Sequence, residues 1–201
     1  MTSTRRPQAR AVRSLHEVLA AARALFAELG VDDVTIDDVA ARAGRTKGSV
    51  YYHFASKVDL FEAVFLSEHR RLVDAVQTTT EGLDPETALR SGLATYLRLV
   101  AADPVAAGIT LVQAPTVLGW HRWRECDGGT FRTSITAALV AAREAGRSPS
   151  EADPEIVADL LLGAVSEAAV AVARDDDSER RAVAVIYALN RLLDGIFRAA
   201  G

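Results

Sequence analysis

One short stretch near the amino terminus gathers hydrogen-bond donors and positive charge at helical spacing. It covers residues 46–57, and its polar side chains alternate with the apolar Val50 and Phe54 so that a helix would show one polar and one apolar side. The donors are Thr46, Lys47, Ser49, Tyr51, Tyr52, His53 and Lys57. Hydroxyl, phenol and cationic groups of this kind bind anionic or acceptor-rich partners. The pattern therefore predicts a binding surface.

Gly48 lies in the first turn of this predicted helix. An alanine there would favour the helix by roughly 1 kcal/mol. The glycine makes sense if the backbone must come close to another molecule, as a recognition helix does when its first residues enter the major groove of DNA. Periodicity alone supports an ordinary surface helix of a bundle equally well, and that alternative stays open on this pattern.

The elements before and around this stretch would position it as the second helix of a helix-turn-helix. TIDD at 35–38 resembles a capping box and opens a short helix to about Ala43. Gly44 supplies a tight turn, and the second helix runs from about residue 46 to residue 53. Val39 and Ala40 would face the apolar side of the second helix. The expected motif spans residues 35–54.

Two runs of sequence carry a resemblance to a known family. The run TKGSVYYHFASK at 46–57 resembles the signature of the tetracycline-repressor (TetR) family, and TIDDVAARAG at 35–44 matches as well. The resemblance covers about 55 contiguous residues. It departs at Arg45-Thr46, where the family more often has a small or apolar residue before Ser. The family implies an all-α chain, with a DNA-binding domain at 1–57 and a ligand-sensing and dimerisation domain at 58–201, in which 58–77 is a connecting helix.

The resemblance also implies a role for each position of the motif. Thr35, Thr46, Tyr51, Tyr52, His53 and Lys57 would mostly contact phosphates. Arg45, Lys47, Gly48 and Ser49 would face base edges, where sequence is recognised, whereas phosphate contacts set register. Val50 and Phe54 would be core residues. Arg5, Arg6, Arg10 and Arg13 could follow the DNA backbone or its minor groove, or form a solvated tail.

Charge and composition agree with a two-part chain. The net charge is −4, yet residues 1–57 hold nine basic and six acidic residues, while the remainder holds fourteen basic and twenty-one acidic ones. Ala, Leu, Val and Arg dominate, which favours helices. A single cysteine fits a reducing compartment. No signal peptide precedes the motif, and the apolar run at 160–173 is expected to be too short to span a bilayer, so we expect a cytoplasmic protein without a membrane partner.

Capping signals predict about nine helices and no strand. An Asp-Pro pair opens helices at 85–101, 104–112 and 154–173. Pro115 is expected to interrupt the chain before a helix at 117–145, and a last helix should cover 179–199. The last two helices are apolar nearly all round, so we expect a dimer formed as a four-helix bundle, with a buried pair inside one chain as the alternative. The expected interface residues are Leu161, Val165, Ala168, Ile186, Leu189 and Leu192.

The segment 111–131 holds both tryptophans and is the expected ligand pocket, since such sites are mostly apolar with a few polar groups. The candidate lining residues are Tyr96, Ile109, Gln113, Trp120, Trp123, Cys126 and Phe131. A structural or coupling role for the stretch 114–120 competes with this interpretation, because the resemblance places that stretch near the connection to the DNA-binding part.

These features together predict a ligand-responsive repressor that binds a palindromic operator in double-stranded DNA as a homodimer. Its small-molecule effector cannot be named from the sequence. An activator or a regulator without a ligand remains an alternative, and a helical small-molecule-binding protein or enzyme is a more remote one. The sequence shows neither a glycine-rich phosphate loop nor a Ser-His-Asp order, and its four histidines lack metal-site spacing, so we expect no catalysis, metal or cofactor.

Overall fold

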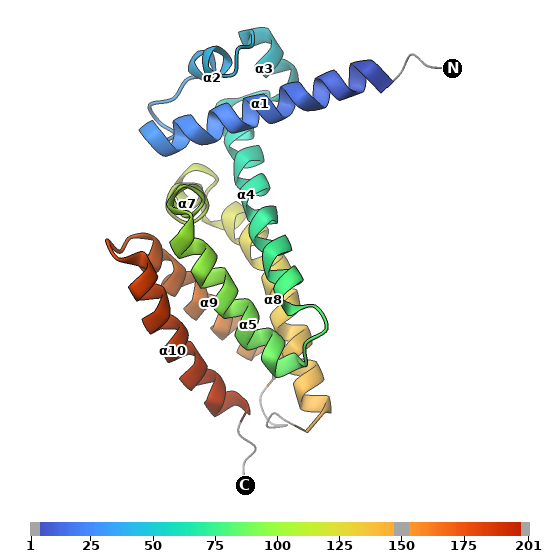
Figure 1. The fold of residues 1–201 in the computed structure, drawn as a ribbon, viewed down its shortest axis with the longest axis vertical. Coiled ribbons are helices and arrows are strands. Elements are labelled where there is room, and N and C mark those ends of the chain that lie inside the picture. The colour runs from blue at the N-terminus through green and yellow to red at the C-terminus, as the bar shows by residue number, and fades with distance from the viewer. Residues whose placement is uncertain (1–4, 147–152, 198–201) are drawn as a thin grey trace.

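The computed structural model describes residues 5–146 and 153–197, except for the side chains of 5–11 and 127–128. Within these residues every regular element is a helix (Figure 1). The elements are α1 (Arg5–Leu29), α2 (Ile36–Arg42), α3 (Lys47–His53), α4 (Lys57–Thr80), α5 (Pro85–Ala102), α6 (Pro104–Ala107), the π-helical η1 (Gly108–Gln113), α7 (Ala114–Val117), α8 (Trp120–Glu144), α9 (Pro154–Ala173) and α10 (Ser178–Phe197). Because α6, η1 and α7 follow one another without a break, the described chain forms nine continuous helices and confirms the all-α prediction.

The first three helices form a small unit at one end of the molecule. α1 lies across the upper end of α4, and α2 and α3 lie beyond it (Figure 1). Phe26 of α1 packs on Phe61 of α4, with ring centroids 5.4 Å apart, and both side chains are fully buried. Val50 of α3 is also fully buried in this core. Burial of these side chains holds the outer side of α3 towards solvent.

α4 belongs to both parts of the chain. Its first turns bury Leu60, Phe61 and Val64 in the amino-terminal core. Its later turns bury Leu72 and Val73, where the helix packs along α5. The same helix therefore packs in both parts of the chain.

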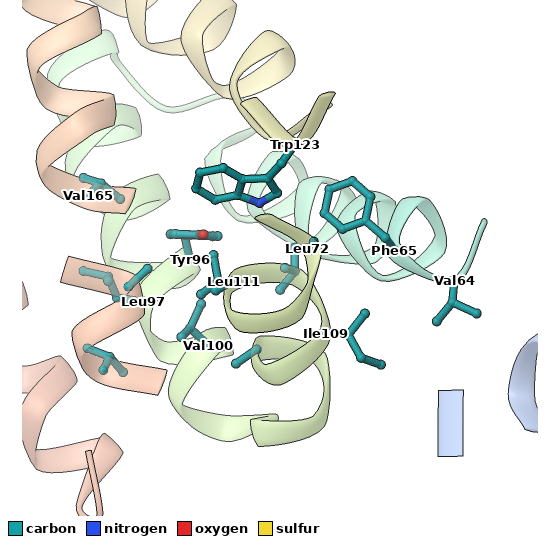
Figure 2. Close-up of a cluster of buried hydrophobic side chains, with 14 of the residues drawn as sticks. Val64, Phe65, Leu72, Tyr96, Leu97, Val100, Ile109, Leu111, Trp123 and Val165 are labelled. Carbon is teal, nitrogen blue, oxygen red and sulfur yellow. The ribbon is translucent and has the colours of Figure 1, made fainter. Parts of the chain in front are cut away.

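The carboxy-terminal body is built from α5, α8, α9 and α10, with the 104–117 helix between it and α1 (Figure 1). All three predicted Asp caps are present: the carboxylates of Asp84, Asp103 and Asp153 accept a hydrogen bond from the first turn of α5, α6 and α9. A buried cluster fills the interior, in which the Trp123 indole lies near Tyr96 (Figure 2).

The predicted break at Pro115 is wrong. Helical backbone continues through it, because the π-helical segment before it ends with the Ala114 N–H donating to the carbonyl of Ile109, and Pro115 then occupies the first turn of α7. Pro115 has no N–H to donate, and the carbonyl of Thr110, five residues before it, accepts from Trp123 Nε1 at 2.9 Å instead. The real break is Gly119, whose φ of 79° stops the helix, and α8 begins at Trp120 rather than at Val117.

The apolar run at 160–173 lies within the longer helix α9. The helix has 20 residues, and its most apolar stretch of 18 residues has a mean hydropathy of 2.0, so by length and composition alone it could span a membrane. In the structure it packs against α5, α8 and α10, and Val165, Ala169 and Val172 are buried there. The core helix of a globular body has the same composition.

Candidate nucleic-acid interface and ligand cavity

Two threonines fix the starts of the short helices. The Thr35 hydroxyl accepts from the Asp38 N–H at 3.2 Å, and the Asp38 carboxylate accepts from the Thr35 N–H at 2.9 Å, which completes the predicted capping box. Hydrogen bonds from the hydroxyl and the N–H of Thr35 lower the pKa of Asp38. The Thr46 hydroxyl accepts from the Ser49 N–H at 3.2 Å and caps α3. Both threonines thus have a structural role within the chain.

The outer side of α3 is open. Tyr52 is 83% exposed and Tyr51 46% exposed, whereas Val50 and Phe54 are buried as predicted. Lys47 and Gly48 are exposed, and Ser49 and His53 are half-buried. A Cβ atom added at Gly48 would meet no atom within 4 Å. Packing within the described chain therefore does not require glycine at this position.

Two of the expected base contacts hold acidic partners. Lys47 Nζ lies 2.8 Å from an Asp37 oxygen, and this hydrogen bond raises the pKa of Lys47. Both side chains are more than half exposed, so the ion pair contributes little to stability and exchanges easily. Arg45 forms an ion pair with Glu17 of α1, with Nε 3.1 Å from the carboxylate. Arg45 thereby ties the turn before α3 to α1.

Lys57 has a role that the sequence did not reveal. Its Nζ donates to the carbonyls of Val31 at 2.7 Å and Asp32 at 3.0 Å, just after α1 ends. These contacts join the first residue of α4 to the α1–α2 connection. No local pattern could have indicated them, because the partners are 26 and 25 residues away in sequence.

A charged cluster connects the two parts of the molecule. Arg23 of α1 donates to Glu68 of α4 at 2.9 Å and to Asp103, at the start of α6, at 3.0 Å. Arg71 pairs with both carboxylates. Burial raises the pKa of Asp103, but the hydrogen bonds from the Ala106 N–H and Arg71 and the charges of both arginines outweigh it, so that the pKa is lowered.

Gln113, expected in the pocket, lies at the same junction. Its Nε2 donates at 3.1 Å to the carbonyl of Phe26 in the last turn of α1. This hydrogen bond joins η1 to α1 across 87 residues of sequence. Gln113 thus lies at the contact between η1 and α1 and does not line the cavity described below.

The other expected pocket residues divide into three groups. Tyr96 and Phe131 line a cavity. Ile109 and Trp123 are core residues, and the Trp123 Nε1 donates to the buried Thr110 carbonyl at 2.9 Å (Figure 2). Trp120 is 62% exposed, and the half-buried Cys126 is not among the lining residues.

The cavity has a volume of about 120 Å³ and lies between four helices. α4 contributes Val73, Val76, Gln77 and Thr80; α5 contributes Ala88, Leu89, Gly92, Leu93 and Tyr96; α8 contributes Thr130, Phe131, Ser134, Ile135 and Ala138; and α9 contributes Leu162, Val165 and Ser166. Sequence reasoning missed most of these residues, because small and aliphatic side chains resemble ordinary core.

The residues expected at the dimer interface differ in how far they are buried within the chain. Leu161, Val165 and Leu189 are buried within the chain itself, and Ala168 and Ile186 are half-buried. Leu192 is 58% exposed. It is one of five large apolar side chains exposed on α9 and α10, which we call the α9–α10 face: Ile156, Leu160, Val183, Tyr187 and Leu192.

Comparisons with known proteins identify the fold and both halves. Residues 18–64 match the family described as "Bacterial regulatory proteins, tetR family", and residues 86–196 match the tetracyclin repressor-like C-terminal domain. The HTH-type transcriptional repressor BepR of Brucella suis is 38% identical over 174 residues, which are 80% of this chain and 81% of BepR. A probable acrEF/envCD operon repressor of Escherichia coli is 33% identical over 102 residues, 50% of this chain and only 46% of that protein.

Solved structures agree along almost the whole chain. A TetR-family transcriptional regulator from Pectobacterium atrosepticum superimposes with a TM-score of 0.79 and 28% identity, covering 95% of this chain and 97% of its own. SmeT, the repressor of a Stenotrophomonas maltophilia multidrug efflux pump, superimposes with a TM-score of 0.72 and 25% identity. The match covers 92% of this chain and 91% of the SmeT chain. With the helix-turn-helix, the connecting helix and the carboxy-terminal body all accounted for, this chain belongs to the TetR family of transcriptional regulators.

Proposed function

We propose that the protein is a cytoplasmic, ligand-responsive repressor that binds a palindromic DNA operator as a homodimer. The observation that carries the proposal is the outer side of α3, where exposed donors surround a glycine at which an added Cβ would meet no atom of the described residues within 4 Å. A helix held by its apolar side and open on its polar side fits the major groove. The relatives BepR and SmeT, both described as repressors, support the direction of regulation.

The ion pairs of the free protein suggest how contacts would be exchanged on DNA. Lys47 can leave Asp37 at little cost, because both groups are exposed to solvent. Arg45 is only 26% exposed and bridges to α1, so it must give up Glu17 before it can contact a base. Tyr51, Tyr52 and His53, near the end of α3, would contact phosphates. The Lys57 ammonium group already donates to two backbone carbonyls, so it would contact a phosphate while keeping those hydrogen bonds.

The α9–α10 face supports the homodimer. Leu160 and Tyr187 are each 70% exposed, and large apolar patches on one face mark association surfaces. Two copies of α9 and α10 would form a four-helix bundle around a two-fold axis. Such a dimer could present its two α3 helices to half-sites about 34–36 Å apart, one turn of DNA.

The route from the cavity to α3 supports the ligand response. Val73, Val76, Gln77 and Thr80 of α4 form one wall of the cavity, and the first turns of α4 lie in the DNA-binding core. A ligand that fits better when α4 has moved favours that state by its difference in affinity. The contacts of Arg23 with Glu68 and Asp103 would follow the movement.

Selection of bound fragments from random DNA duplexes tests the proposal. We expect a palindromic consensus, and an affinity that falls with salt by a slope of about −0.9 in log–log form for each phosphate contact. Absence of a consensus or of salt dependence would refute DNA recognition. A reporter gene carrying the consensus then separates a repressor from an activator by the sign of the change when the protein is expressed.

A further inference from the structure

We infer that the cavity between α4, α5, α8 and α9 takes a neutral, mostly apolar ligand with about one ring and a hydrogen-bond donor, and that it rejects ions of the same shape. This inference rests on the proposed function, because it names the class of effector. Three observations support it: the lining has no charged side chain, two of its hydroxyls already donate within their helices, and the cavity is small.

The wall carries no charged side chain at neutral pH. None of the seventeen lining residues is Asp, Glu, Lys, Arg or His. Arg132, next to the lining Phe131, pairs with Asp159 at 2.5 Å on the exposed side of α8. His69 packs behind Phe131, with ring centroids 5.6 Å apart, and is not on the wall. An ionic ligand would lose its hydration here and find no opposite charge.

Two hydroxyls of the wall, on Thr80 and Ser134, have lone pairs but no free proton for a ligand. Thr80 Oγ1 donates to the Val76 carbonyl at 3.0 Å, and Ser134 Oγ donates to the Thr130 carbonyl at 3.1 Å. A hydroxyl has one proton, so a group that already donates within its helix offers a bound molecule only its lone pairs. A ligand with an O–H or N–H group is therefore favoured over one without it.

The volume restricts the ligand to about one ring. An engineered protein cavity of roughly 150 Å³ holds benzene, and this one measures about 120 Å³. It cannot widen between α4 and α5 without moving them. Even a Cβ atom at Gly92 would lie 3.3 Å from Thr80 Cγ2 and 3.4 Å from Val76 Cγ1, closer than side chains usually pack. A larger ligand must push α4 away.

Four probes with one ring and one substituent separate these properties: benzyl alcohol, toluene, benzylamine and benzoate. Isothermal titration of the full-length protein at pH 7, without DNA, should give benzyl alcohol a Kd on the order of 1 mM or lower. Toluene should bind about 2- to 10-fold more weakly, because it lacks the donor. Benzylamine and benzoate should bind on the order of 100-fold more weakly still. Equal binding of either ion, or no binding of benzyl alcohol, would overturn the inference.

Two variants with one control assign the binding to this cavity. Ala138→Phe fills the cavity and should abolish the titration heat, whereas Ala137→Phe, exposed on the same helix, should leave it unchanged. If Ala138→Phe does not fold, Ser134→Asp decides: Ser134 is an exposed lining residue, so a carboxylate there should turn preference towards benzylamine. Unchanged binding of all four probes in a folded variant would place the ligand elsewhere.

The operator assay separates this inference from the proposed function. If benzyl alcohol binds as expected but leaves the affinity for the selected DNA unchanged, the ligand class stands and the ligand response fails. If no probe binds while the protein still selects a palindrome, the ligand class fails and DNA recognition stands.

Discussion

Leu160 and Leu161 are neighbours on α9, one exposed and the other buried, and truncating each to alanine separates the effect on the dimer from the effect on the fold. Leu160 is 70% exposed in the protomer, whereas Leu161 is 5% exposed in its core. The substitution Leu161→Glu would bury a charge in the core of the protomer and would unfold it, so it cannot test association. Leu160→Ala and Leu161→Ala are matched, because they remove the same atoms.

The expected sizes follow from burial. Leu160→Ala removes about three carbon atoms at about 0.8 kcal/mol each, and 70% of that surface is free to be covered by a partner, which gives roughly 1.7 kcal/mol per protomer. Both protomers contribute in a two-fold interface, so the dimer should weaken by roughly 3 kcal/mol, on the order of 100-fold in Kd. Leu161→Ala should instead lower the free energy of unfolding by about 2–5 kcal/mol.

Sedimentation velocity over a dilution series measures the first effect, and urea unfolding measures the second. The unfolding should be run at several protein concentrations, because dissociation alone lowers apparent stability at low concentration. The assignment of the α9–α10 face would be refuted if Leu160→Ala associated as strongly as the wild type while Leu161→Ala folded but stayed monomeric.

Three further substitutions address the DNA interface, the junction and the core. Gly48→Ala should keep or raise the melting temperature, since the methyl group meets no atom within 4 Å, but weaken operator binding; unchanged affinity would remove Gly48 from the interface. Folding lowers the pKa of Asp103, so its carboxylate stabilises the fold above its unfolded pKa of about 3.9, and this contribution is lost as pH falls through the lower folded pKa. In Asp103→Asn the free energy of unfolding should therefore fall less steeply than in the wild type as the pH is lowered below about 4. An unchanged pH dependence would contradict this role of Asp103. Trp123→Phe should cost about 1–3 kcal/mol in urea unfolding, because the buried Thr110 carbonyl loses its donor, and wild-type stability would argue against this.

Helix starts and the position of the motif could be predicted from the sequence because they depend on neighbours a few residues away. Asp153 and Pro154 start α9 where expected, since a capping carboxylate reaches an N–H in the following turn. The Thr35–Asp38 box likewise needs only three residues of spacing. α2 and α3 each expose one polar side for the same local reason.

Tertiary structure decided which partner each side chain meets. The apolar pattern of α9 showed that several of its sides need cover, but only the fold shows that Leu161 faces α9's own protomer and Leu160 faces out. Gln113 and Lys57 meet carbonyls far along the chain, and no periodicity reports such contacts. A side chain's type and spacing limit what it can bind, whereas its neighbours depend on how the helices cross. That crossing results from the packing of the whole core.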